Sequence, residues 1–178
     1  EKYEKEMPNL EKIKARELMS KIIEAQIETG QPYMLYKDSI NNKSNQKNIG
    51  VIKSSNLCAE IVEYSDKSET SVCNLASIAL PKFVKKSKNR KNKEYDFKAL
   101  YKTSKLATKN LDEVIDINFY PTKKTKTSNN KHRPIGLGIQ GLADVFFELE
   151  IAYDSEEAKK INKLIFETIY FGALEASN

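Results

Sequence analysis

Apolar side chains return at three- and four-residue steps in four parts of the chain, the spacing found on the buried face of an amphipathic helix. The four predicted helices span about 10–28, 97–115 and 141–149, and from Asp154 or Ser155 to the end of the sequence. Gly30 and Pro32 are expected to end the first helix, and Asp96 to cap the start of the second.

The segments between these helices have shorter apolar patterns. Residues 51–64 are rich in β-branched side chains and are predicted to be partly extended. Residues 72–80 (VCNLASIAL) form an apolar run that fits either a buried strand or the start of a helix. Pro121–Arg133 is polar and predicted to be a connecting loop. Helices that alternate with short apolar segments favour an α/β fold in which helix dominates.

Composition narrows the class of protein. With 178 residues, 39% of them hydrophobic and 31% charged, the chain is long enough for one domain with a core. No apolar run approaches the roughly 20 residues of a membrane helix, so no membrane partner is expected. The sequence begins with Glu1 and stops inside a predicted helix at Asn178, and we expect both ends to be cut points in a longer protein.

Much of the net charge of +5 lies in Lys85–Lys93 (KKSKNRKNK), where six of nine residues are basic. Such a run could contact nucleic acid, which makes a helical nucleic-acid-binding module one alternative function. No aromatic side chain interrupts the run to stack on bases, so a hydrated surface loop is the preferred interpretation.

Two cysteines, Cys58 and Cys73, and one histidine, His132, are too few for a structural zinc site or a secreted disulfide framework. No metal site is predicted, and a reducing, cytoplasmic compartment is expected. A disulfide between the two cysteines would then be transient, which makes a thiol–disulfide oxidoreductase the second alternative function.

The first chemical candidate is Asn56-Leu57-Cys58-Ala59-Glu60. In an extended stretch, Asn56, Cys58 and Glu60 would share one face and Leu57 and Ala59 the other. An ionised Glu60 disfavours a thiolate, so the local sequence indicates a protonated thiol, which can still react by losing a hydrogen atom. A buried cysteine that acts as a small hydrophobe is the simpler alternative, for Cys58 and also for Cys73.

The sequence Gly136-Leu137-Gly138-Ile139-Gln140-Gly141 matches G-x-G-x-x-G. Dinucleotide binding needs a strand before this motif, and 128–134 (SNNKHRP) does not predict one. The glycines are therefore interpreted as close packing at a turn that enters a helix. His132 and Arg133 are expected to hold a turn through hydrogen bonds rather than to form a catalytic pair.

Five segments, in this order, resemble the large subunit of class I ribonucleotide reductases. They are TGQPYMLYKDSINNKSNQKNIG (Thr29–Gly50), SSNLCAEIVEY (Ser54–Tyr64), VCNLASIAL (Val72–Leu80), HRPIGLGIQGLAD (His132–Asp144) and IFETIYFGALEAS (Ile165–Ser177). The resemblance implies that 1–178 is part of a catalytic ten-stranded α/β barrel, with a central finger loop at about 51–64 and no complete second domain. The lysine-rich loop 85–93 departs from the family pattern.

The resemblance also implies roles for individual residues. Cys58 resembles the cysteine that becomes a thiyl radical and abstracts the 3′ hydrogen of a ribonucleoside diphosphate. Glu60 resembles the carboxylate that accepts the 3′-hydroxyl proton, and Asn56 the amide that binds the ribose hydroxyls. Cys73 resembles one of two cysteines that reduce the 2′ carbon and end as a disulfide, and its partner cysteine lies outside this chain.

The resemblance implies partners as well. They are the rest of the large subunit in a homodimer or larger assembly, a small subunit with a diiron-tyrosyl radical, ATP and dNTP effectors, and thioredoxin or glutaredoxin as reductant. We expect no cofactor to bind this chain directly. We also expect the 178 residues alone to be inactive and to expose apolar surface, because they cannot close a barrel.

Overall fold

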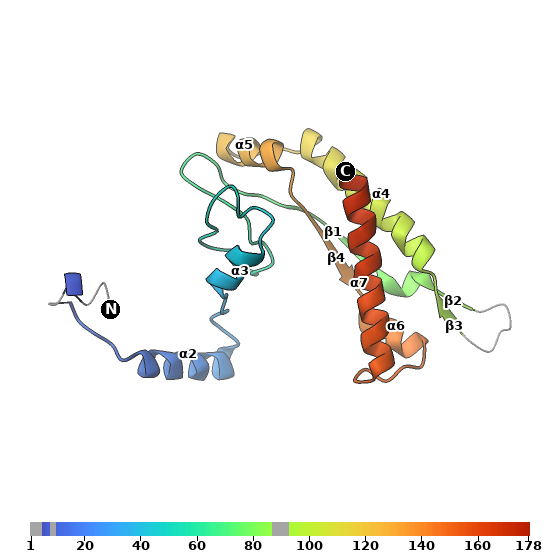
Figure 1. Ribbon diagram of the computed structural model, residues 1–178, viewed down its shortest axis with the longest axis horizontal. Helices are drawn as coiled ribbons and strands as arrows, with labels where there is room; N and C mark the ends of the chain where they lie inside the picture. The colour runs from blue at the N-terminus through green and yellow to red at the C-terminus, as the bar shows by residue number, and fades with distance from the viewer. Residues whose placement is uncertain (1–4, 8–9, 87–92) are drawn as a thin grey trace. The chain divides into compact units, whose positions relative to one another are not determined.

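The computed structural model describes residues 5–7, 10–86 and 93–178 (Figure 1). The chain divides into two compact units, Glu1–Tyr64 and Ser65–Asn178, which are described separately below.

The first unit contains helices α2 (Ala15–Thr29) and α3 (Lys37–Lys43). Helix α2 ends where the sequence indicates, because Gly30 adopts the left-handed conformation, with φ 76°, that closes a helix C-terminus. Its predicted start near residue 10 is wrong. The helix begins at Ala15, after Lys14 in an extended conformation, and Leu10 and Ile13 lie outside it, 54% and 70% exposed.

Residues 51–64, which were predicted to be partly extended, form no strand in the described part of the chain. The side chain of Asn41 takes the hydrogen bonds that a neighbouring strand would have provided. Its Oδ1 accepts from the Ile52 amide at 2.7 Å and its Nδ2 donates to the Ile52 carbonyl at 2.9 Å. Ile52 is buried, and the Gln46 side chain accepts the amide of Tyr64 at 2.8 Å. Side-chain amides therefore fix an irregular path.

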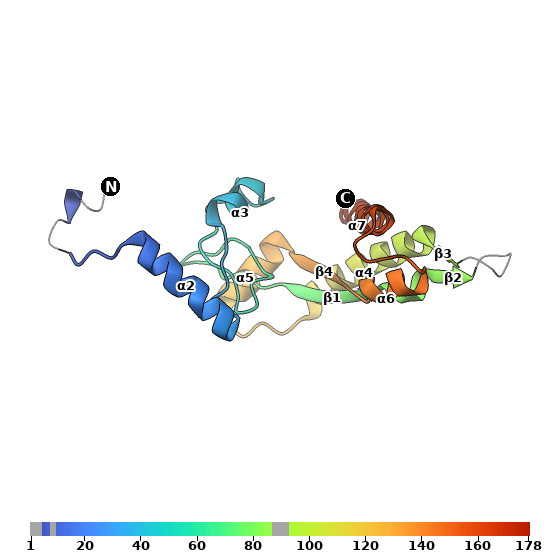
Figure 2. The same ribbon diagram turned by 90° about the horizontal axis from the view of Figure 1, so that it is seen from below.

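The second unit is built on two parallel strands, β1 (Asn74–Ala79) and β4 (Ile135–Gln140). They lie side by side in both views (Figures 1 and 2), with Asn74 opposite Ile135 and Ala79 opposite Gln140. Helix α4 (Phe97–Ile117) packs on this pair, and helix α7 (Glu156–Ser177) packs on α4. The buried core consists of Ile78, Leu80, Phe83, Leu100, Val145, Ile165 and Ile169. The unit is mixed helix and strand, which confirms the α/β class.

Residues 72–80, which fitted a strand or a helix, contain strand β1. A short 3-10 helix, η1 (Leu80–Phe83), follows, with Pro81 at its start. Strands β2 (Val84–Lys86) and β3 (Lys93–Tyr95) then pair in antiparallel fashion. Residues 87–92, which make up most of the predicted lysine-rich loop, lie outside the described residues.

Three predicted helices are confirmed: α4, α6 (Leu142–Glu148) and α7. Asp96 caps α4 by accepting the amide of Ala99 at 2.9 Å, and Ser155 caps α7 by accepting that of Ala158 at 3.1 Å. In α4 the buried face also contains Ser104, whose hydroxyl donates to a carbonyl of its own helix and needs no further partner. None of the helices in the described residues is both long and apolar enough to span a membrane.

Residues 121–133 are not a loop, since they contain helix α5 (Lys123–His132). The helix lacks an apolar stripe, and its buried side chains are Thr125, Ser128 and Asn129. Thr122 and Thr125 form a reciprocal capping box that satisfies the first amides of the helix. Polar packing and capping therefore replace the hydrophobic pattern on which the prediction relied.

The interpretation of the G-x-G-x-x-G motif is corrected as well. Gly136 and Gly138 lie inside strand β4, and only Gly141 occupies the turn into α6, with φ 79°. A phosphate-binding loop places these glycines after the strand and before the helix. In this chain they form the strand itself, so the motif is not a dinucleotide-binding fingerprint.

Candidate active site

The segment around Cys58 is a β-turn at the tip of a loop. The amide of Ala59 donates to the carbonyl of Asn56 at 3.1 Å, which leaves Leu57 and Cys58 at the two central positions. Ala59 has φ 67°, a conformation that few residues other than glycine adopt. The alternating arrangement expected for an extended strand is therefore wrong, and Leu57, expected to anchor the opposite face, is 89% exposed.

Asn56 closes the base of this loop. Its Oδ1 accepts the amide of Ile61 at 3.0 Å, and the Ser55 hydroxyl donates to the carbonyl of Ile61 at 2.5 Å, so two side chains hold both backbone groups of Ile61. A backbone amide can only donate, so the contact with Ile61 must be made by the amide oxygen of Asn56. The group that Asn56 can offer to a ligand is therefore its Nδ2, a hydrogen-bond donor.

The Cys58 thiol is exposed and borders an open hollow of about 490 Å³ within the first unit. The lining is largely apolar and aromatic, and includes Tyr33, Met34, Leu35 and Tyr36. It contains no lysine, arginine or histidine, and α2 contributes residues from its C-terminal end. A nucleophilic thiolate would need a nearby cation or a helix N-terminus. The lining of this hollow in the described residues provides neither.

Glu60 follows directly after the turn and is exposed. Within the described residues, no side-chain hydrogen bond joins Cys58 to Asn56 or to Glu60. The structure therefore places Asn56 and Cys58 in one turn, with Glu60 next to it.

Cys73 belongs to the second unit, immediately before β1. It is half-buried, and its thiol donates to the carbonyl of Asn74 at 3.7 Å. A parallel strand pair places residues i and i+2 of one strand on the same face. Cys73 therefore shares a face with Leu75, and this face of β1 is adjacent to Gly136 of β4.

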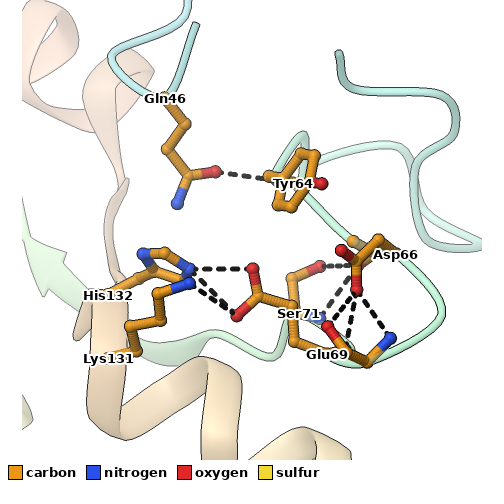
Figure 3. Close-up of polar contacts among 9 residues, drawn as sticks. Gln46, Tyr64, Asp66, Glu69, Ser71, Lys131 and His132 are labelled. Carbon is orange, nitrogen blue, oxygen red and sulfur yellow. Dashed lines mark hydrogen bonds and ion pairs between the residues drawn. The ribbon is translucent and has the colours of Figure 1, made fainter. Parts of the chain in front are cut away.

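The sequence did not reveal a buried carboxylate, Glu69, which is 3% exposed (Figure 3). Its two oxygens each lie 3.2 Å from Nε2 of His132, and Nζ of Lys131 lies 3.6 Å away. Asp66 shapes the loop that presents Glu69, because its Oδ1 accepts the amides of Ser68 and Glu69 at 2.6 and 2.9 Å. The Asp-x-Ser-Glu sequence is typical of a turn closed by an aspartate side chain, and this pattern could have indicated the turn that precedes Glu69.

His132 and Arg133 make hydrogen bonds to distant elements, His132 to Glu69 and Arg133 to helix α4, rather than within a turn as the sequence suggested. Arg133 adopts a left-handed conformation at the end of α5 and donates to carboxylates of Asp112 at 2.6 Å and Asp116 at 2.8 and 3.0 Å. These hydrogen bonds lower the pKa of Asp116. The carboxylates of α4 therefore neutralise Arg133.

Comparison with known proteins defines the class to which this fold and this cysteine loop belong. The family model described as "Ribonucleotide reductase, barrel domain" matches residues 1–178, and the chain belongs to that family.

Individual relatives carry the same family name. The chain is 57% identical over 176 residues to the ribonucleoside-diphosphate reductase large subunit of Plasmodium falciparum. It is 54% identical over 177 residues to the large chain of Schizosaccharomyces pombe, and 51% over 190 residues to the large subunit of Arabidopsis thaliana. Each match covers 99% of this chain but only 21–23% of the relative, so the chain spans about a fifth of these proteins.

Proposed function

We propose that this chain forms part of the catalytic subunit of a class I ribonucleoside-diphosphate reductase, and that Cys58 carries its transient thiyl radical. The observation that carries the proposal is the position of Cys58 at an exposed turn, beside a hollow without cations, in a chain of the reductase barrel family. Residues 51–64 then serve as the finger loop of a partial barrel domain that extends over 1–178.

The proposed chemistry follows from this placement. The Cys58 radical takes the hydrogen atom from the 3′ carbon of the ribose, and Glu60 accepts the proton of the 3′ hydroxyl as a general base. Asn56 binds the ribose hydroxyls through Nδ2, because its Oδ1 is engaged by the loop. Cys73 and a partner cysteine outside this chain supply two electrons and two protons. The 2′ hydroxyl leaves as water, and the two thiols become a disulfide. Cys58 then returns its hydrogen atom to the 3′ carbon, which regenerates the radical, and Glu60 returns its proton to the 3′ oxygen.

The function needs partners that this chain does not contain. We propose the remainder of the large subunit in a homodimer or larger assembly, a small subunit with a diiron-tyrosyl radical, ATP and dNTP effectors, and thioredoxin or glutaredoxin as reductant. The described residues contain no group of three or more His, Cys, Asp or Glu side chains suited to a metal ion. We propose the cytoplasm as the compartment, because two cysteines in 178 residues do not form the disulfide framework of a secreted domain.

A burst experiment tests the function. The complete large subunit that contains this chain is fully reduced, freed of external reductant, and mixed with its small subunit and a ribonucleoside diphosphate. We expect a limited burst of deoxyribonucleoside diphosphate, with Cys73 recovered in a disulfide by mass spectrometry. Cys73→Ser should abolish the burst while leaving substrate binding intact.

Two results would overturn the proposal: no deoxyribonucleotide from the wild-type assembly, or a full burst during which Cys73 stays reduced. A thiol–disulfide oxidoreductase would instead reduce a protein disulfide without any nucleotide. The same preparation is therefore also assayed for reduction of insulin disulfides, where we expect no activity that depends on Cys58.

A further inference from the structure

The glycine at position 136 lies against the sulfur of Cys73. In the parallel register Gly136 is opposite Leu75, and Cys73 lies two residues earlier on the same face of β1. A methyl group added at Gly136 would lie 3.2 Å from the Cys73 sulfur and 2.4 Å from Cδ2 of Leu75. Because Gly136 has no side chain, it leaves room for the Cys73 sulfur at its present position.

We propose that Gly136 is a positioning residue for Cys73, which keeps the sulfur in the place required for reduction of the substrate. The proposal rests on the proposed function, in which Cys73 is a reductant. Gly136 lies in a regular strand with ordinary backbone angles, so the glycine is needed for space rather than for conformational freedom.

The two neighbours of the added methyl group would respond differently. The contact with Leu75 involves Cδ2, the far end of a flexible side chain, which can change rotamer while its backbone stays in place. Cys73 is half-buried, and its thiol is held by the Asn74 carbonyl. A carbon 3.2 Å from its sulfur forces that sulfur to shift by a few tenths of an ångström or to change rotamer. The lasting effect of the substitution therefore falls on the position of the sulfur.

Gly138 provides a matched control in the same strand. It is two residues further along the same face of β4, opposite Ser77. A methyl group at Gly138 would meet only the Ala76 carbonyl, at 3.6 Å, which is an ordinary van der Waals distance. Gly138→Ala and Gly136→Ala thus make the same chemical change in the same strand, but only the second crowds Cys73.

The experiment uses the complete large subunit with its small subunit and measures turnover together with thiol alkylation. A displacement of about 1 Å in an active site can cost about a hundredfold in rate, so a shift of tenths of an ångström predicts about a tenfold fall in kcat for Gly136→Ala. Gly138→Ala should stay within about twofold of wild type, by the same reasoning. Alkylation of Cys73 should be slower in Gly136→Ala, with Cys58 in the same molecule unchanged.

The double variant Leu75→Ala/Gly136→Ala separates positioning of the sulfur from crowding of Leu75. It removes the contact with Leu75 and keeps the contact with Cys73, so turnover should remain low and Cys73 alkylation slow. Recovery of both to wild-type values would overturn the proposal, as would normal turnover in Gly136→Ala. If Cys73→Ser itself turns over normally, the proposed function fails, and the alkylation rates alone still decide whether Gly136 positions the sulfur.

Discussion

Replacing Glu69 with alanine should release the loop 65–71 from helix α5. The Glu69 carboxylate is 3% exposed, and the side chain of its partner His132 is 9% exposed, so water has little access to either group. Loss of one partner of a buried ion pair costs about 3–5 kcal/mol, and an unpaired buried neutral group about 1–3 kcal/mol. We therefore expect a loss of about 3 kcal/mol, where the two ranges meet.

Amide hydrogen exchange measures this loss locally. The amide of Thr70 donates to the carbonyl of Lys124 at 3.3 Å, so its protection reports whether the loop is docked on α5. At 1.4 kcal/mol per factor of ten, Glu69→Ala should accelerate exchange there about a hundredfold. Glu69→Gln keeps an acceptor oxygen and a similar volume, so its effect should be smaller.

An exposed ion pair serves as the control. Glu167 lies 3.6 Å from Lys163, the same separation as Glu69 from Lys131, but its side chain is 57% exposed. Glu167→Gln should change local protection by less than about 0.5 kcal/mol. Exchange at Thr70 that stays within about twofold of wild type in Glu69→Ala would refute the argument that burial gives this contact its strength.

Three further predictions concern the second unit. Burial raises the pKa of Tyr95 above its ordinary value. The free energy of unfolding should therefore fall as the pH rises above about 10, the pKa of tyrosine in the unfolded chain. In denaturant titrations, Tyr95→Phe should lose less stability than wild type over this pH range. Leu100 is fully buried, so Leu100→Ala should cost about 2–5 kcal/mol by denaturation, whereas Leu106→Ala, at a side chain 60% exposed, should cost far less. Thr122→Ala removes the capping box of α5 and should cost about 0.5–2 kcal/mol, seen as faster amide exchange in its first turn.

The long helices were predictable because the spacing of apolar residues and the position of the capping residue indicate the same helix. In α7, the buried residues Ala158, Ile165, Ile169 and Gly172 follow the helical stripe read from the sequence, and Ser155 marks the start. Such helices bury an apolar face against the rest of the unit, so the buried face can be read from the spacing of apolar residues in the sequence.

Elements that are held by polar side chains could not be predicted from hydrophobic spacing. Helix α5 buries Thr125, Ser128 and Asn129, which leave no hydrophobic period to detect. The path of 51–64 depends on Asn41, whose amide replaces a neighbouring strand. The turn at Cys58 depends on the amide of Asn56 closing the loop at Ile61. In each case individual polar side chains fix the path of the backbone, and an average over a window of sequence cannot show this.

The candidate site divides in the same way. The sequence identified the Asn56, Cys58 and Glu60 residue types, and resemblance supplied their proposed roles. The expected alternation was wrong because the turn, rather than a strand, presents the thiol. Glu69 was missed because its burial arises from α5, an element the sequence did not predict.

The most direct test of the account is the replacement of the Cys58 sulfur by oxygen in the complete large subunit. Cys58→Ser is assayed for conversion of a ribonucleoside diphosphate with the small subunit present, after circular dichroism and substrate binding show that the variant is folded. A serine O–H bond is a poor source of a radical, so we expect no deoxyribonucleotide from the variant and continuous turnover from wild type. Turnover by Cys58→Ser at the wild-type rate would contradict the account.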